Sequence, residues 1–213
     1  MTTEKLFWEN PYLDKVTAKI INVRGSTVTL DRTIFYAFSG GQESDSGTIN
    51  GKKVQEAKIV GNEIEYVLEP NHRLKEGDNV LIKIDWENRY KIMRLHFAAE
   101  LILELVYQNY NRPHKIGANI TSKKSRLDFD WEGNISYIFP ELLEKFNRIV
   151  QSDLPIISEF SDRENERKYW QIKGFARVAC GGTHIKRTGE IEGIILKREN
   201  IGRNKERIEI YLK

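Results

Sequence analysis

The segment CGGTH, residues 180–184, places a thiol and an imidazole four positions apart on a glycine-rich turn. A thiolate and an imidazole are both zinc ligands, and the glycines let the backbone fold back so that Cys180 and His184 converge. A single Cys-x-x-x-His pair is a weak signal, because buried cysteines that bind nothing are common. The pair therefore indicates a metal site only if further ligands join it.

His96 and Glu100 form a second pair, with the spacing that puts two side chains on one face of a helix. Imidazole and carboxylate are both zinc ligands. The alternative is a surface pair that contributes roughly a few tenths of a kcal/mol to helix stability. Together, the helix pair and the turn pair offer enough ligands for a tetrahedral site, or for three ligands and a water molecule.

A third candidate is the loop FYAFSGGQESDSG, residues 35–47. Gly40 and Gly41 permit close approach of the backbone to another surface, and Gln42 adds a hydrogen-bonding amide. The alternative is a connecting loop that is rich in turn-forming residues and has no further role. Basic residues also gather at residues 123–126 and 197–207, where they either meet phosphates or form a solvated charged face.

Composition limits the class of protein. The chain has 213 residues, a formal net charge of +3 and 31% charged residues, which is an ordinary globular balance. One cysteine excludes an internal disulfide. No apolar run approaches the ~20 residues that span a bilayer, and the first ten residues lack the apolar core of a signal peptide. We therefore expect a cytoplasmic protein with no membrane partner.

The elements that must position these residues change character along the chain. Short apolar alternations at residues 16–20, 26–30, 54–60, 64–68 and 80–84, with turn signals at Asn50-Gly51 and Gly61-Asn62, predict hairpins of a small β-barrel or sandwich. A helical pattern begins only near residue 86. We place the boundary between two domains there, with residues 1–88 in the first and residues 89–213 in the second.

The second domain has an α+β pattern. An apolar residue at every fourth position from Met93 to Leu105 predicts a helix over residues 86–110, with Pro113 after its end. Asn134 is expected to cap a second helix that reaches Val150. The remaining expectations are a charged helix near residues 161–169 and strands at residues 116–121, 126–130, 156–157, 172–178, 191–197 and 207–212.

Three ordered motifs resemble those of the AlaX proteins, which are freestanding relatives of the editing domain of alanyl-tRNA synthetase. They are FYAFSGGQESDSGTI (35–49), RLHFAAELILEL (94–105) and CGGTHI (180–185). The resemblance covers nearly the whole chain and points to the medium-length class. It implies an N-terminal barrel followed by an α+β editing domain of the kind found in threonyl- and alanyl-tRNA synthetases. It also implies a Zn²⁺-dependent hydrolase that deacylates mischarged alanine tRNA carrying serine or glycine.

The resemblance also implies residue roles. His96, Cys180 and His184 take the family's metal-ligand positions, whereas Glu100 stands where the family has a second helix histidine. Glu100 either ligates the metal, orients a water as a base, or marks a metal-poor site with altered activity, and we favour direct ligation. An anionic ligand lowers the Lewis acidity of the ion, so the change affects rate or substrate more than fold.

Other residues are candidates for substrate contacts. The resemblance implies that Gly40, Gly41 and Gln42 help to reject the correctly charged substrate. Glu100 and Thr183 are the candidate catalytic residues. Three side chains are candidates to bond a serine hydroxyl: Asn119, Thr121 and Thr183. Two rival functions remain open: a non-catalytic tRNA- or zinc-binding protein on this fold, and a hydrolase of another acyl ester. The oligomeric state, monomer or homodimer, is also open.

Overall fold

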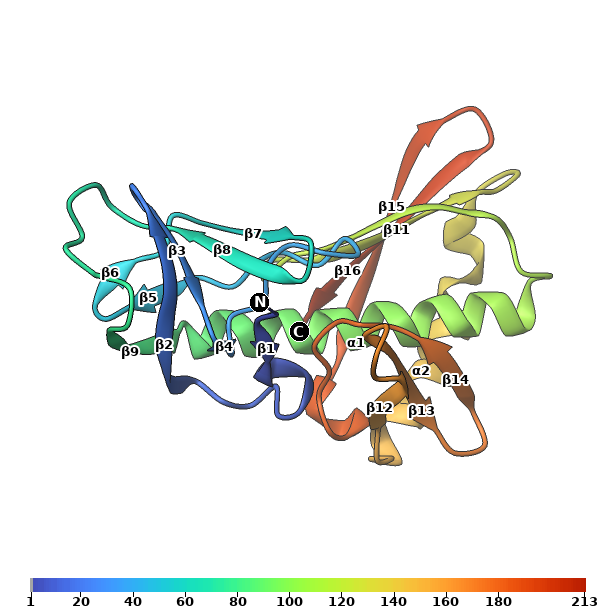
Figure 1. Cartoon of the computed structure of the whole chain (residues 1–213). Coiled ribbons are helices and arrows are strands. Elements are labelled where there is room, and N and C mark those ends of the chain that lie inside the picture. The colour runs from blue at the N-terminus through green and yellow to red at the C-terminus, as the bar shows by residue number, and fades with distance from the viewer. Residues whose placement is uncertain (1) are drawn as a thin grey trace. The chain divides into compact units, whose positions relative to one another are not determined.

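The computed structural model describes residues 2–213 and divides into two compact units (Figure 1). The first comprises the chain up to Ser39 together with Glu43–Tyr90, and the second comprises Gly40–Gln42 and Lys91–Lys213. The class is α+β, as the sequence predicts. Among the described residues, no helix is both long enough and apolar enough to cross a bilayer.

The first unit is built on a curled antiparallel sheet of seven strands in the order β6-β5-β9-β2-β3-β8-β7. The strands are β2 (Lys15–Arg24), β3 (Thr27–Leu30), β5 (Gly47–Ile49), β6 (Lys52–Lys53), β7 (Glu56–Val60), β8 (Glu63–Val67) and β9 (Asn79–Ile84). A parallel pair, β1 (Glu4–Lys5) with β4 (Arg32–Thr33), and a 3₁₀ turn, η1 (Leu6–Trp8), complete the unit. Alternate residues of β9 are buried, which explains the period-two pattern in the sequence.

The predicted hairpin turns are confirmed. Asn50 and Gly51 both have positive φ, 51° and 76°, between β5 and β6. This is the backbone that a two-residue hairpin with the right-handed strand twist requires. Gly61, with φ of 61°, makes the turn between β7 and β8.

Helix α1 (Trp86–Asn109) matches the predicted helix to within one residue. Asp85 begins it, since its Oδ1 accepts a hydrogen bond from the Asn88 backbone N–H at 3.1 Å. The apolar stripe of the sequence is buried: Met93, Phe97 and Leu101 are 0% exposed. Pro113 follows the helix end, as expected.

The second unit contains a four-stranded antiparallel sheet in the order β10-β11-β16-β15. Its strands, each of which overlaps a predicted strand, are β10 (Lys115–Ile120), β11 (Ser125–Asp130), β15 (Ile194–Gly202) and β16 (Lys205–Leu212). Leu95 of α1 packs with Ile120 of β10. Helix α2 (Phe139–Gln151) buries Leu142, Phe146 and Val150. Asn134 caps the 3₁₀ turn η2 (Ile135–Ile138) that precedes α2, and not α2 itself.

A three-stranded antiparallel sheet corrects two expectations. It consists of β12 (Ile157–Asp162), β13 (Arg167–Ile172) and β14 (Ala176–Ala179). The predicted helix at 161–169 is wrong, because Lys168, Trp170 and Ile172 alternate as buried residues of a strand. The predicted strand at 172–178 is interrupted by a turn in which Gly174 has φ of 79°. A 3₁₀ turn, η3 (Thr188–Ile191), leads towards β15.

Candidate metal centre

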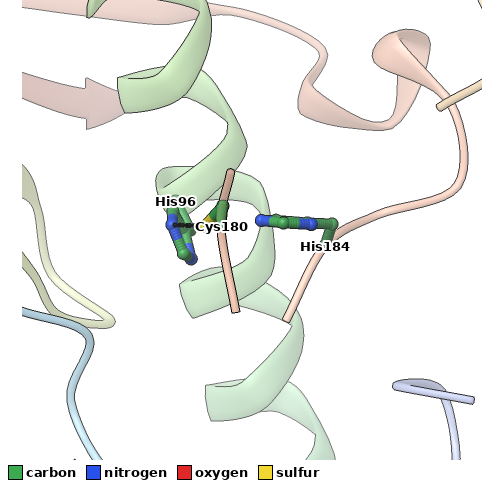
Figure 2. Close-up of side chains that lie close together, drawn as sticks. All are labelled: His96, Cys180 and His184. Atoms are coloured by element: carbon green, nitrogen blue, oxygen red, sulfur yellow. Dashed lines mark hydrogen bonds between the residues drawn. The ribbon is translucent and has the colours of Figure 1, made fainter. Parts of the chain in front are cut away.

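Three of the four predicted ligands converge within the second unit. His96 projects from α1, while Cys180 and His184 lie in the loop that follows β14. One ligand atom from each residue lies within 4.8 Å of the other two. Figure 2 shows the His96 and His184 rings on either side of Cys180, with the Cys180 Sγ 3.5 Å from His96 Nε2. The helix residue and the turn residues are therefore neighbours, although they lie far apart in the sequence.

Gly182 leaves the space that the His96 ring occupies. A Cβ placed on Gly182 would lie 2.1 Å from His96 Cε1 and 2.8 Å from Gln42 Oε1, which is too close for any side chain. The Cys180 backbone N–H donates to the Lys168 carbonyl of β13 at 3.0 Å, and this bond ties the start of the loop to the sheet. The glycine thus gives His96 room, and the sheet fixes where the loop begins.

Glu100 lies beside the cluster. Its Oε1 is 3.3 Å from His96 Nε2, and its Oε2 accepts a hydrogen bond from the Trp170 indole N–H at 3.0 Å. Two ligands of a tetrahedral zinc ion, at bond lengths of about 2.0–2.3 Å, lie roughly 3.3–3.6 Å apart. The separations from His96 Nε2 to Cys180 Sγ and to Glu100 Oε1 both fall in that range.

The surroundings of His184 are the strongest indication of a metal. Its ring is 3% exposed and packs edge-on to His96 and Phe97. Its Nδ1 is 3.4 Å from Ser158 Oγ. Its Nε2 is buried and has no hydrogen-bond partner among the described residues. A buried nitrogen without a partner costs about 1–3 kcal/mol, and a metal ion would satisfy it. The residues present therefore fit a zinc ion.

The pKa values of two of the three buried titratable groups suit a metal site. Burial lowers the pKa of His96, but the Cys180 sulfur and the Glu100 carboxylate outweigh it, and the pKa rises to about 10. Burial raises the pKa of Glu100, but the hydrogen bond and charge of His96 bring it down to about 2. Burial and the nearby His96 lower the pKa of His184 to about 3. At pH 7 Glu100 is therefore ionised and His184 neutral, as metal ligands must be, whereas His96 carries a second proton, on Nε2, that a metal ion would have to displace.

The chain matches known proteins over its full length. The alanyl-tRNA editing protein AlaX-M of Pyrococcus horikoshii is 34% identical over 214 residues, which cover 99% of this chain and 98% of that protein. The chain belongs to the AlaX-M family. A second AlaX-M, from Saccharolobus solfataricus, is 28% identical over 237 residues, with 99% of each chain covered. The family resemblance expected from the three motifs is confirmed.

Longer proteins contain a segment similar to this chain. The alanine–tRNA ligase of Methanococcus aeolicus is 35% identical over 229 residues, which cover 97% of this chain but only 25% of that enzyme. The model for class II (A) tRNA synthetases matches residues 4–88, and the model for the second additional domain of threonyl and alanyl tRNA synthetases matches residues 171–209. The chain thus corresponds to about a quarter of that ligase.

The other predicted site residues are Thr183, Asn119, Thr121 and the glycine-rich segment Gly40–Gln42. Thr183, in the turn, and Gln42 are hydrogen-bonded to each other. The Gly41 carbonyl accepts from the Ile120 backbone N–H at 2.8 Å and from Asn119 Nδ2 at 3.3 Å. These bonds hold the glycine-rich segment along β10. Gly40, with φ of 59°, has open space where a side chain would stand.

Thr121 does not share this arrangement. Its hydroxyl donates to the Lys124 carbonyl at 2.9 Å and accepts from the backbone N–H groups of Lys123 and Lys124. The side chain therefore stabilises the turn between β10 and β11.

Sequence reasoning missed two supporting residues of the AlaX-M centre. Trp170 is 0% exposed and holds Glu100 through its indole N–H. A buried tryptophan needs a hydrogen-bond acceptor for its indole N–H. The sequence therefore suggests that Trp170 has an acceptor, but it does not show which residue supplies it. Ser158, beside His184, lies on β12, and nothing in the sequence pattern distinguishes it from other exposed serines.

Proposed function

We propose that this chain is a hydrolase that removes serine or glycine from mischarged alanine tRNA, at a zinc ion held by His96, Cys180 and His184. The convergence of these three side chains carries the proposal, together with the buried Nε2 of His184, which has no hydrogen-bond partner among the described residues. Membership of a family whose relatives are named as alanyl-tRNA editing proteins supplies the substrate class.

Glu100 is the fourth member of the proposed ligand set. Its Oε1 stands at a ligand–ligand distance of 3.3 Å from His96 Nε2, and the Trp170 indole fixes its other oxygen. Zinc, when bound, would act as a Lewis acid on the ester or its attacking water. The anionic ligand reduces that acidity, so Glu100 favours firm binding of the ion over the highest rate.

Thr183 is proposed to contact the substrate. Gln42 Nε2 donates to Thr183 Oγ1 at 2.9 Å, which leaves the hydroxyl proton of Thr183 free to donate. A hydroxyl donor beside the scissile ester can bond an oxygen of the aminoacyl group. Asn119, held against Gly41, is the proposed partner for the serine hydroxyl, because a site that bonds a hydroxyl discriminates against a substrate that lacks it. This contact favours seryl-tRNA over alanyl-tRNA, and it gives no advantage to glycyl-tRNA, which also lacks the hydroxyl.

Deacylation of seryl-, glycyl- and alanyl-tRNA by the purified zinc-loaded protein tests this proposal. We expect fast hydrolysis of seryl-tRNA, slower hydrolysis of glycyl-tRNA, which cannot make the Asn119 contact, and little hydrolysis of alanyl-tRNA. Cys180→Ala should abolish turnover, whereas His114→Ala should not change it, because the His114 side chain is 75% exposed and pairs with Asp130 outside the cluster. Hydrolysis by Cys180→Ala at the wild-type rate would contradict the metal site.

The rival functions give different results in the same assay. Binding of tRNA without turnover of any aminoacyl ester would identify a non-catalytic binding protein. Turnover of small acyl esters, with aminoacyl-tRNA untouched, would identify a different hydrolase. Either outcome rejects the editing proposal.

A further inference from the structure

Gln42 has a side-chain amide whose orientation its neighbours determine. The Thr183 backbone N–H, which can only donate, lies 3.1 Å from the Gln42 side-chain oxygen Oε1. The amide nitrogen Nε2 faces Thr183 Oγ1 at 2.9 Å. If the amide were turned over, two N–H donors would face each other, so Oε1 must be the atom that points at the turn.

The same oxygen decides which nitrogen of His96 carries a proton. Gln42 Oε1 is 2.8 Å from His96 Nδ1. Because a carbonyl oxygen only accepts, Nδ1 must carry the proton and donate it. A neutral imidazole with Nδ1–H has its lone pair on Nε2. His96 Nε2 is the atom that faces Cys180 Sγ and Glu100 Oε1.

Gln42 is also closed off from solvent. It is 1% exposed, and both ends of its amide are hydrogen-bonded. Gly41 next to it has φ of 84°, and a Cβ there would lie 2.7 Å from the Ala118 carbonyl oxygen, so the segment can lie against β10 only with glycine. The amide is thus held in one place by the turn on one side and by β10 on the other.

We propose that Gln42 is a positioning residue for the metal centre, which keeps His96 in the tautomer whose Nε2 lone pair binds the ion. This inference rests on the proposed zinc site. It differs from the expectation that Gln42 contacts the substrate, because the amide acts through His96. It also gives the glycine-rich loop a defined role, since the loop brings one hydrogen-bond acceptor to the far side of a ligand.

Metal affinity distinguishes this role from a purely structural one. Gln42→Met keeps the length and apolar volume of the side chain but removes the acceptor. Gln42→Glu keeps an acceptor for both His96 Nδ1 and the Thr183 N–H, and the Thr183 hydroxyl can rotate to donate to it. Gln151→Met, at the exposed end of α2, is the matched control. Zinc affinity is measured by competition with a chromophoric chelator.

Loss of an outer hydrogen bond to a ligand histidine typically weakens metal binding by about 10–100-fold. We expect that loss in Gln42→Met, near wild-type affinity in Gln42→Glu, and no change in Gln151→Met. The absorption bands of bound Co²⁺ should shift in Gln42→Met alone. Equal zinc affinity in Gln42→Met and the wild type would overturn the inference, even if the variant were less stable.

A measurement on the wild type alone covers the case in which Gln42→Met does not fold. Nitrogen-15 NMR of the zinc-loaded protein should show His96 with a proton on Nδ1 and the metal on Nε2. The opposite tautomer would overturn the inference. If the wild type bound no zinc, the metal centre itself would be rejected, and this role with it, whereas zinc binding with the wrong tautomer would reject this role only.

Discussion

Glu100 is the one carboxylate in the proposed ligand set, and two hydrogen-bonding contacts fix its position. Two groups hold it, His96 through one oxygen and Trp170 through the other. The side chain is 15% exposed, so the charge is largely removed from water and needs those partners. A histidine at this position would bind a metal without the added negative charge.

Substitution of Glu100 tests its role as a ligand. Glu100→Gln keeps an acceptor for Trp170 but removes the charge, and we expect zinc affinity to fall by tenfold or more. Glu100→His should retain zinc and raise the deacylation rate, because a neutral ligand leaves the ion more acidic. Glu144→Gln, on the exposed face of α2, is the control and should bind zinc normally. Unchanged zinc content in Glu100→Gln would reject ligation.

Gly181 and Gly182, which lie between Cys180 and His184, provide a second test. A Cβ on Gly182 would collide with His96, whereas one on Gly181 would meet nothing within 4 Å. We therefore expect Gly182→Ala to weaken zinc binding strongly and Gly181→Ala to leave it within a few fold of wild type. Titration with zinc in the presence of a competing chelator measures both. Equal affinities would show that the turn does not constrain His96.

At the scale of the element, the hairpin of β15 and β16 is held by a buried carboxylate. Glu206 of β16 has a side chain that is 1% exposed and accepts hydrogen bonds from Arg198 and Asn200. The Arg198 hydrogen bond is the main reason that the pKa of Glu206 lies below its ordinary value of 4.5. A depressed carboxylate pKa stabilises the fold above that ordinary value, and the contribution is lost as pH falls through the folded-state pKa.

Glu206→Gln should therefore destabilise the protein at pH 7, by about 1–3 kcal/mol for a charge-assisted hydrogen bond that is removed from a buried site. The difference from wild type should shrink as the pH falls from the ordinary value of 4.5 through the lower folded-state pKa, because the wild-type carboxylate becomes protonated first in the unfolded and then in the folded protein. Denaturant unfolding at pH 7 and at acidic pH measures it. A difference that stays constant over this range would show that the charge of Glu206 is not involved.

The elements also show how far the sequence predicts the fold. Helix α1 and the strands on either side of it are predicted well, because long periodic patterns report which face is buried. The helix predicted at 161–169 is wrong because the many charged residues of that segment mask the alternation of buried and exposed positions in β13. Lys168 is buried, and its Nζ lies over the Phe160 ring in a cation–π contact that no periodicity in the sequence reveals. The ligand set follows from motifs, whereas Trp170 and Ser158 become visible only through contacts across the fold.

For the whole molecule, a metal ion held by the cluster would link His96 of α1 to Cys180, 84 residues later in the chain. An ion that binds only the folded chain adds about 2.7 kcal/mol to stability when its free concentration is about 100 times its Kd. Without it, His184 Nε2 remains buried and has no partner among the described residues. The stability of the second unit should therefore depend on metal.

Removal of zinc by a chelator should lower the Tm of the wild type by several degrees, and added zinc should restore it. His184→Ala should show a lower Tm that neither chelator nor zinc changes, while His114→Ala should respond like the wild type. Differential scanning calorimetry measures each. A wild-type Tm that does not respond to chelator would mean that the cluster holds no ion of consequence for the fold.

We propose that His96, Cys180 and His184 surround one zinc ion. Anomalous scattering from crystals of the zinc-loaded protein, recorded on both sides of the zinc absorption edge, tests it most directly. We predict a single peak about 2.0–2.3 Å from His96 Nε2, Cys180 Sγ and His184 Nε2, with Glu100 Oε1 in the fourth position. The absence of a peak at these side chains, or a peak elsewhere in the molecule, would contradict the claim.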